Sequence, residues 1–207
     1  MATQFARSLS RYQRGRRAVL FLLLLVAAFA LLFISSYPEQ GEFHEFVEAV
    51  GISLIGIAVI GRLWCTLYIG GRKAAELIQD GPYSITRNPL YVFSSIGATG
   101  AGAETGSVVV ALFFGIATAI AFHVVAKKEE GVLAGAFGDA FTSYCARVPR
   151  FFPKLSLYKD SVTVTVYPKR LYTTFMDSLV FFAAFPFFEF IGWLQFHHYL
   201  PIFLRLP

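Results

Sequence analysis

The most informative shortage in this 207-residue sequence is charge. Only 15% of the residues are Asp, Glu, Lys or Arg, while 56% are hydrophobic and 17% are aromatic; a soluble domain is usually about 25% charged. The charged residues are missing from long continuous runs, which is typical of helices that cross a bilayer. We therefore expect an all-α, polytopic membrane protein that forms a single membrane domain over residues 1–207.

Cysteine and several catalytic motifs are also scarce or missing. Cys65 and Cys145 are far apart and form no Cys-x-x-Cys pair, so we expect neither a disulfide framework nor a zinc site. The sequence contains no His-Glu-x-x-His, no phosphate-binding P-loop and no Gly-x-Ser-x-Gly motif. These gaps argue against metal-dependent, nucleotide-phosphate and hydrolase chemistry, and we predict no metal site.

The basic residues border the apolar runs and so indicate topology. The net charge of +5 lies beside apolar runs, so we expect the basic residues to contact anionic lipid headgroups. We expect no nucleic acid as a partner. The arginine-rich residues 1–17 precede the first apolar run, and the loop 38–45 after it has no Lys or Arg. This run is longer than the ~7–15 residues of a secretory signal core, so we favour a retained helix. We predict a bacterial inner-membrane protein with a cytoplasmic N-terminus and a periplasmic C-terminus.

The apolar runs predict about five transmembrane helices. Their expected ranges are 18–36, 46–69, 90–103, 107–126 and 171–196. The third run reaches only about 20–24 Å, less than the ~30 Å hydrocarbon core, so we expect a short helical hairpin that turns at 104–106 and packs inside the bundle. Residues 70–89 and 127–170 are predicted to be cytoplasmic. Within them, the alternating residues 161–167 suggest an extended linker or a small hairpin.

Three charged residues interrupt the predicted spans. Arg62 lies near the cytoplasmic end of the second, and Asp177 and Glu189 lie in the last. A charge in a span is costly unless it faces the bundle interior or reaches the interface. For Arg62 we favour a side chain that snorkels to the headgroups. The two acidic residues are functional candidates, although Asp177 is close to the cytoplasmic end, where hydration is easy.

The densest polar segment, residues 81–91, reads Gly-Pro-Tyr-Ser-Ile-Thr-Arg-Asn-Pro-Leu-Tyr. Its Gly-Pro pair predicts a turn, and Pro89 predicts the start of a helix. Arg87 and Asn88 would then precede a helix N-terminus, where an anion is favoured. The alternative is a plain connector between two membrane helices, with Arg87 as a headgroup anchor.

A second polar segment follows the fourth run. It starts with Glu129 and Glu130, and Phe137, Phe141 and Tyr144 fall on the same helical face as Glu130. This pattern predicts an amphipathic extension of the fourth helix, ended by the basic, aromatic turn 147–153. An interfacial helix with headgroup-binding arginines is the alternative. Both polar segments fall on the predicted cytoplasmic side, where a hydrophilic cofactor could meet an acceptor arriving from the membrane.

The order and spacing of these motifs resemble the isoprenylcysteine carboxyl methyltransferase and phospholipid methyltransferase superfamily. The resemblance rests on Gly-Pro-Tyr and Arg-Asn-Pro-Leu-Tyr within 81–91, on Glu129-Glu130, and on Phe-Gly, Tyr and Val-Pro-Arg-Phe-Phe-Pro within 137–153. It covers about residues 70–153, the expected catalytic core. It implies a membrane enzyme that uses S-adenosylmethionine, releases S-adenosylhomocysteine and methylates a lipophilic, membrane-embedded acceptor, such as a prenyl carboxylate or a lipid headgroup.

The resemblance also implies a set of site residues. Those expected to bind the cofactor are Gly81, Pro82, Tyr83, Arg87, Asn88, Pro89, Tyr91, Glu129, Glu130 and Tyr144. Those expected to act in catalysis are Glu130, Arg147 and Arg150. Arginine suits the carboxylate of the cofactor, glutamate suits its ammonium group or ribose hydroxyls, and tyrosine rings suit its sulfonium. A carboxylate acceptor is already a nucleophile, and Arg147 or Arg150 could orient it.

Asn88 departs from the pattern of many family members, which carry His there. Asn keeps hydrogen-bonding capacity but cannot become cationic near neutral pH, so a mechanism in which this position titrates is in doubt. Two other readings stay open. The chain could be a non-catalytic membrane binding or assembly protein that keeps the methyltransferase fold, or a reductase or other lipid-modifying enzyme of similar helical architecture.

Overall fold

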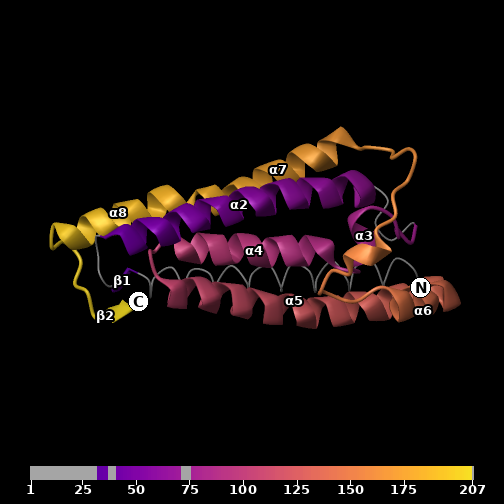
Figure 1. Cartoon of the computed structure of the whole chain (residues 1–207), viewed down its shortest axis with the longest axis horizontal. Helices are drawn as coiled ribbons and strands as arrows, with labels where there is room; N and C mark the ends of the chain where they lie inside the picture. Colours follow the sequence, from indigo (N-terminus) through magenta and orange to yellow (C-terminus); the bar gives the residue numbers. More distant parts are fainter. Residues whose placement is uncertain (1–31, 37–40, 71–75, 207) are drawn as a thin grey trace, which may run out of the picture.

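The computed structural model describes residues 32–36, 41–70 and 76–206 as a bundle of long helices (Figure 1). The elements are β1 (Ile34–Ser36), α2 (Glu42–Ile69), α3 (Pro82–Ile85), α4 (Pro89–Ala103), α5 (Val108–Phe137), α6 (Asp139–Arg147), the 3-10 turn η1 (Leu155–Leu157), α7 (Pro168–Phe182), α8 (Ala184–Phe196) and β2 (Leu204–Leu206). The predicted all-α class is confirmed, with only the small parallel pair β1–β2 as strand structure in the described residues.

Three helical stretches of the described chain are long and apolar enough to cross a membrane: α2, α5 and the consecutive pair α7–α8. With 30 residues, α5 extends about 45 Å, so its C-terminal part exceeds a ~30 Å hydrocarbon core. The 15 residues of α4 reach only about 22 Å. Helix α4 ends at Ala103 and α5 begins at Val108, as the predicted hairpin requires. The number of spans stays a prediction.

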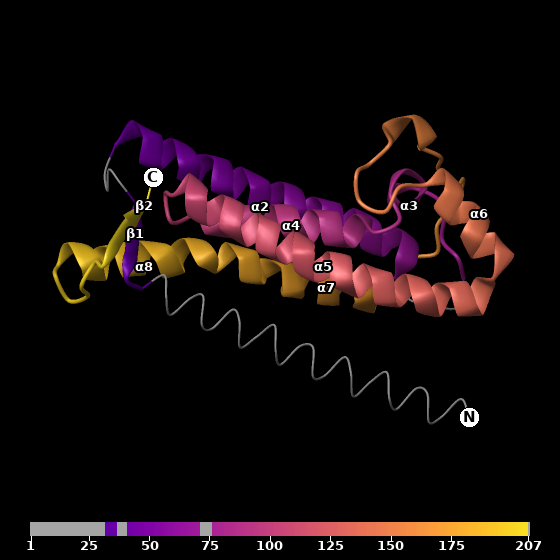
Figure 2. The same cartoon turned by 90° about the horizontal axis from the view of Figure 1, so that it is seen from below.

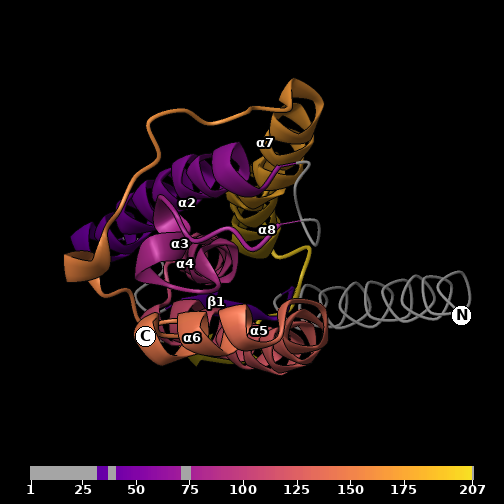
Figure 3. The same cartoon turned by 90° about the vertical axis from the view of Figure 1, so that its right-hand side faces the viewer.

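Helix α4 lies between α2 and α5, and α7 packs along α2 (Figures 1 and 3). The helices approach closely through small residues. A Cβ added at Gly100 would lie 2.7 Å from the carbonyl oxygen of Gly51 and 3.0 Å from Cγ1 of Ile55. Contact of helix backbones through glycine is a common way to pack helices in membranes, and it holds the short α4 inside the bundle.

Arg62 does not snorkel, so this expectation was wrong. Its Nε donates to Oγ of Ser178 in α7 at 2.8 Å, and its Nη1 donates to Oγ of Ser94 in α4. Its guanidinium also lies 5.8 Å from the ring centre of Phe181. The guanidinium of Arg62 therefore has two hydroxyl acceptors and an aromatic ring as partners inside the bundle. Through these contacts Arg62 links α2 to α4 and α7.

One predicted boundary, the end of the first span, also needs correction. Residues 34–36 form β1, because they pair with β2 in a register that sets Ile34 opposite Leu204, and they do not end a first span; residues 18–31 of that predicted span lie outside the described part of the chain. The last apolar run, predicted as the span 171–196, lies within the candidate span Pro168–Phe196. It is divided at Ala183 into α7 and α8, near Pro186, which cannot donate a backbone hydrogen bond. Residues 161–167 form no strand in the described structure, so the linker interpretation was the better one.

Candidate functional site

The two polar segments lie together at the end of the bundle where α3 and α6 are found (Figure 2). Backbone hydrogen bonds fasten them to each other: Arg87 N donates to Pro149 O at 2.9 Å, and Lys154 N donates to Ile85 O at 2.9 Å. The backbone N–H of Arg87 is thus already paired with the second segment.

The Gly-Pro turn takes the form of a single helical turn. Gly81 has φ +57°, and a Cβ there would lie 2.4 Å from the ring of Tyr68, so this position both needs a left-handed backbone and excludes a side chain. Pro82 starts α3 and Pro89 starts α4, as the sequence predicts. Asn88 precedes α4, but its side chain does not cap the helix. Its Nδ2 donates instead to the backbone carbonyl of Arg150, in the second polar segment, at 3.2 Å.

A cavity of about 110 Å³ lies between the α3 loop and helices α4, α5 and α6. Its lining includes seven of the residues predicted to bind a cofactor: Tyr83, Arg87, Asn88, Tyr91, Glu129, Glu130 and Tyr144. The other three, Gly81, Pro82 and Pro89, shape the loop beside it. The sequence analysis did not assign a role to Glu76, Leu77, Ile78, Leu133 and Phe141, which also line the cavity. Apart from Phe141, which shares the helical face of Tyr144, these residues belong to no recognisable pattern.

Glu130 lies between two guanidinium groups. Arg150 Nη2 donates to Oε2 of Glu130 at 2.7 Å and Arg150 Nε donates to Oε1 at 3.0 Å, while Arg87 Nη2 lies 3.2 Å from Oε1. The side chains of Glu130 and Arg87 are 13% and 11% exposed, and that of Arg150 is 30% exposed. Burial opposes ionisation of Glu130, but hydrogen bonds from Arg150 and the charge of Arg87 lower its pKa below the ordinary value. Two cations around one anion leave a formal charge of +1.

Tyrosines provide the polar and aromatic part of the cavity. Tyr91 stacks on Phe122 of α5 with ring centres 4.6 Å apart, and its Oη donates to Oε2 of Glu129 at 2.8 Å. Tyr144 Oη donates to the backbone carbonyl of Tyr83 at 2.7 Å. The hydroxyl of Tyr83 is buried without a hydrogen-bond partner among the described residues, and burial raises its pKa well above the ordinary value. It therefore remains a protonated donor that a ligand could satisfy.

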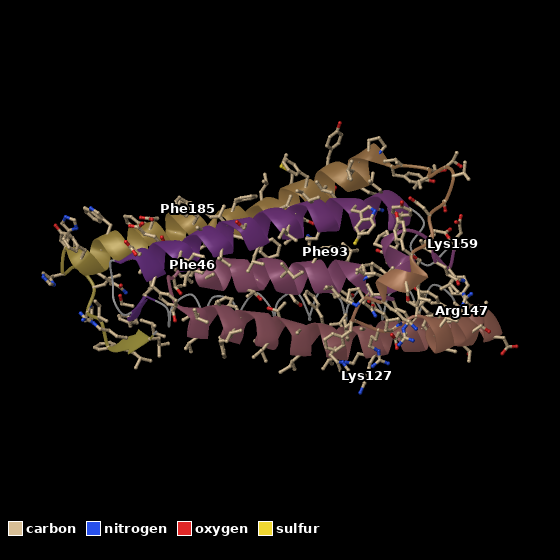
Figure 4. All side chains as sticks on the ribbon, in the orientation of Figure 1. Phe46, Phe93, Lys127, Arg147, Lys159 and Phe185 are labelled. Atoms are coloured by element: carbon tan, nitrogen blue, oxygen red, sulfur yellow. The ribbon has the colours of Figure 1, made fainter. Side chains whose placement is uncertain are left out.

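Arg147 and Arg150 have different surroundings, although the sequence suggests similar roles. Arg147 is exposed on α6 and its Nη2 donates to Oε1 of Gln79 at 2.7 Å (Figure 4). Helix α6 ends at Arg147, so Arg150 leaves the chain from a turn and reaches Glu130. The structure brings Arg150 into contact with Glu130, although Arg150 is not among the described residues that line the cavity, and it leaves Arg147 at the surface.

The fold and the site define a class: an all-α membrane protein with a polar pocket at one end of its bundle. A family model described as phospholipid methyltransferase matches residues 46–140. The chain is 37% identical over 194 residues to the nickel-cobalt-cadmium resistance protein NccN of Alcaligenes xylosoxydans xylosoxydans, covering 94% of this chain and 91% of the relative. It is 37% identical over 173 residues to the cobalt-zinc-cadmium resistance protein CzcN of Cupriavidus metallidurans, covering 84% and 78%. No solved structure matches. The chain belongs to the isoprenylcysteine and phospholipid methyltransferase superfamily.

Proposed function

We propose that this protein is an S-adenosylmethionine-dependent methyltransferase that acts on a lipophilic acceptor within the membrane, either an isoprenoid or prenyl carboxylate or a lipid headgroup. The observation that carries the proposal is the convergence of the family motifs. Residues from 83 to 91, the pair 129–130 and Tyr144 are distant in sequence, yet they line one cavity. That cavity lies at the polar end of the bundle, next to the short helix α4.

The chemistry of the cavity suits the cofactor. The described lining contains one guanidinium, that of Arg87, and three carboxylates. Arg87 suits the cofactor's carboxylate, and the surplus of negative charge suits its ammonium and sulfonium groups. Glu129 offers an acceptor for an ammonium group or ribose hydroxyls, and the unpaired hydroxyl of Tyr83 offers a donor. When bound, S-adenosylmethionine would supply an electrophilic methyl group. The cavity of about 110 Å³ is smaller than the ~300–1,000 Å³ of typical small-molecule sites, so binding requires its walls to move apart.

The two arginines at Glu130 are suited to different tasks. Arg87 is the more buried, and its Nη1 also donates to the backbone carbonyl of Cys145 at 2.9 Å, so it is held on two sides. Arg150 is nearly three times as exposed and can turn toward a second ligand. We assign Arg87 to the cofactor and Arg150 to the acceptor. With a carboxylate acceptor, alignment by Arg150 is sufficient and no general base is needed.

The names of the two relatives refer to resistance to nickel, cobalt, zinc and cadmium. For this chain we propose that any such role depends on methylation of a membrane component, since the family motifs line the cavity that we propose for the cofactor. The small cavity volume favours one alternative, a non-catalytic binding or assembly protein that keeps the methyltransferase fold.

A methyl-transfer assay distinguishes the methyltransferase from the non-catalytic alternative. Protein purified in lipid nanodiscs would be incubated with S-adenosylmethionine labelled in its methyl group and with bacterial membrane extracts. We expect label in the organic-extractable fraction, lost in Arg87→Ala and Glu130→Ala. Lys127→Ala, which alters an exposed charge on the same helix as Glu130 (Figure 4), is the matched control and should keep full transfer. No transfer by folded protein would favour the non-catalytic alternative, whereas label that persists in Arg87→Ala would contradict the assignment of Arg87 to the cofactor.

A further inference from the structure

A second and larger cavity is lined by residues from the start of α2 and from α8. These parts of the two helices lie at the end of the bundle opposite α3 and α6 (Figures 1 and 2). The volume of this cavity is about 660 Å³, within the ~300–1,000 Å³ of small-molecule sites. Four carboxylates line it: Glu45, Glu48, Glu104 and Glu189. Among the described lining residues there is no Lys or Arg, so the cavity favours positive charge.

Glu104 distinguishes this cavity from a solvated acidic patch. The residue is 3% exposed, and both oxygens of its carboxylate are buried with no hydrogen-bond partner in the described structure. It follows the last turn of α4, whose C-terminal dipole also repels an anion. A Cβ at Gly51 would lie 2.6 Å from Oε1 of Glu104, so the absence of a side chain at Gly51 makes room for the carboxylate. A buried unpaired carboxylate is costly, and a bound cation would supply the missing partner.

Neighbouring acidic groups increase the cost of an unpaired negative charge at Glu104. Burial, followed by the charges of Glu48 and Glu189, raises the pKa of Glu104 to about 7. His44 Nε2 lies 3.0 Å from Oε1 of Glu48, which places one imidazole among the four acids. Helix α8 contributes the aromatic side chain of Trp193 to the lining, and aromatic faces attract organic cations.

We propose that this cavity binds an organic ammonium group, with Glu104 as its buried anchor. An organic cation fits better than a directly coordinated metal ion for two reasons. The cavity is much larger than a single ion, and its wall is partly aromatic. In addition, no three His, Cys, Asp or Glu side chains in the described residues are placed to hold a metal. This site is independent of the proposed methyl transfer.

Calorimetric titration of the detergent-purified protein with spermidine tests the proposal. At physiological ionic strength we expect saturable binding that Glu104→Gln weakens at least about tenfold. Glu42→Gln is the matched control, because it removes the same charge from the first turn of α2, outside the cavity lining, and it should change the affinity less than about twofold. If Glu104→Gln does not fold, Glu189→Gln provides the second variant, with an expected loss of about threefold.

Three results would overturn the proposal: no saturable binding, equal weakening by Glu42→Gln and Glu104→Gln, or displacement of spermidine by an equal concentration of Zn²⁺. A second arm identifies where the ammonium group comes from. In nanodiscs of phosphatidylglycerol with added phosphatidylethanolamine, a weaker apparent affinity for spermidine would point to a lipid headgroup as the source. An unchanged affinity would point to a soluble amine, and both results support the site.

Discussion

Replacing Glu130 with Gln is the perturbation that most directly tests how the polar end of the bundle is held together. The carboxylate of Glu130 binds Arg150 at 2.7 Å and Arg87 at 3.2 Å. The glutamine side chain has the same size as that of glutamate and keeps one oxygen that accepts hydrogen bonds, but it carries no negative charge. The guanidinium of Arg87, only 11% exposed, then remains without its ion pair.

The expected loss follows from burial. Removing one partner of a buried ion pair costs about 3–5 kcal/mol, whereas an exposed pair contributes about 0–1 kcal/mol. The Glu130 side chain is 13% exposed and that of Arg150 is 30% exposed. The ion pairs of Glu130 are thus intermediate between buried and exposed pairs, and we expect Glu130→Gln to lower the free energy of unfolding by about 2 kcal/mol. For a chain of this length, 1 kcal/mol changes Tm by about 2–4 °C. Glu130→Gln should therefore lower Tm by about 4–8 °C.

Thermal unfolding followed by tryptophan fluorescence in detergent measures this change. Glu129→Gln is the neighbouring control, since its amide still accepts a hydrogen bond from Tyr91, and it should lower Tm by less than about 2 °C. The folded-state pKa of Glu130 is depressed, so its stabilisation is present above the ordinary glutamate pKa and lost as pH falls through the folded value. The difference from wild type should shrink in acid. Equal Tm values for Glu130→Gln and wild type at neutral pH would refute the reasoning.

Three further predictions concern other parts of the molecule. Tyr91→Phe loses the hydrogen bond to Glu129, so calorimetry should show about three- to tenfold weaker S-adenosylmethionine binding. Gly100→Ala presses a Cβ against the α2 backbone, so Tm should fall by about 5 °C; Gly56→Ala, with open space around it, should not lower it. Glu104 has a pKa raised from 4.5 to about 7, which penalises the folded state increasingly as pH rises through that window. In amine-free buffer, melts of Glu104→Gln should therefore show up to about 3 kcal/mol of added stability near pH 8 and little near pH 4.

The sequence was most informative where local chemistry decides the structure. Proline at position 89 and the Gly-Pro pair at 81–82 restrict the backbone directly, and α3 and α4 begin at these prolines. The length of the third apolar run predicted a helix too short to cross the membrane. The family motifs identified most of the polar residues that line the smaller cavity, because those motifs carry unusual residue types at fixed spacing.

Contacts between distant segments were not predictable in this way. Arg147 and Arg150 look equivalent in the sequence, but α6 ends between them, so only Arg150 reaches Glu130. The partners of Arg62 come from two other helices, which no local pattern reveals. The burial of Glu104 likewise depends on how closely α2 approaches α4.

The central claim is that the cavity between α3, α4, α5 and α6 binds the methyl donor. Titration calorimetry with S-adenosylhomocysteine on the detergent-purified protein tests it most directly. We predict saturable binding in the micromolar range, lost in Arg87→Ala and Glu130→Ala and retained in Lys127→Ala, with all proteins eluting as folded species. Absence of binding to folded wild-type protein would contradict the claim and leave a methyltransferase fold without its cofactor.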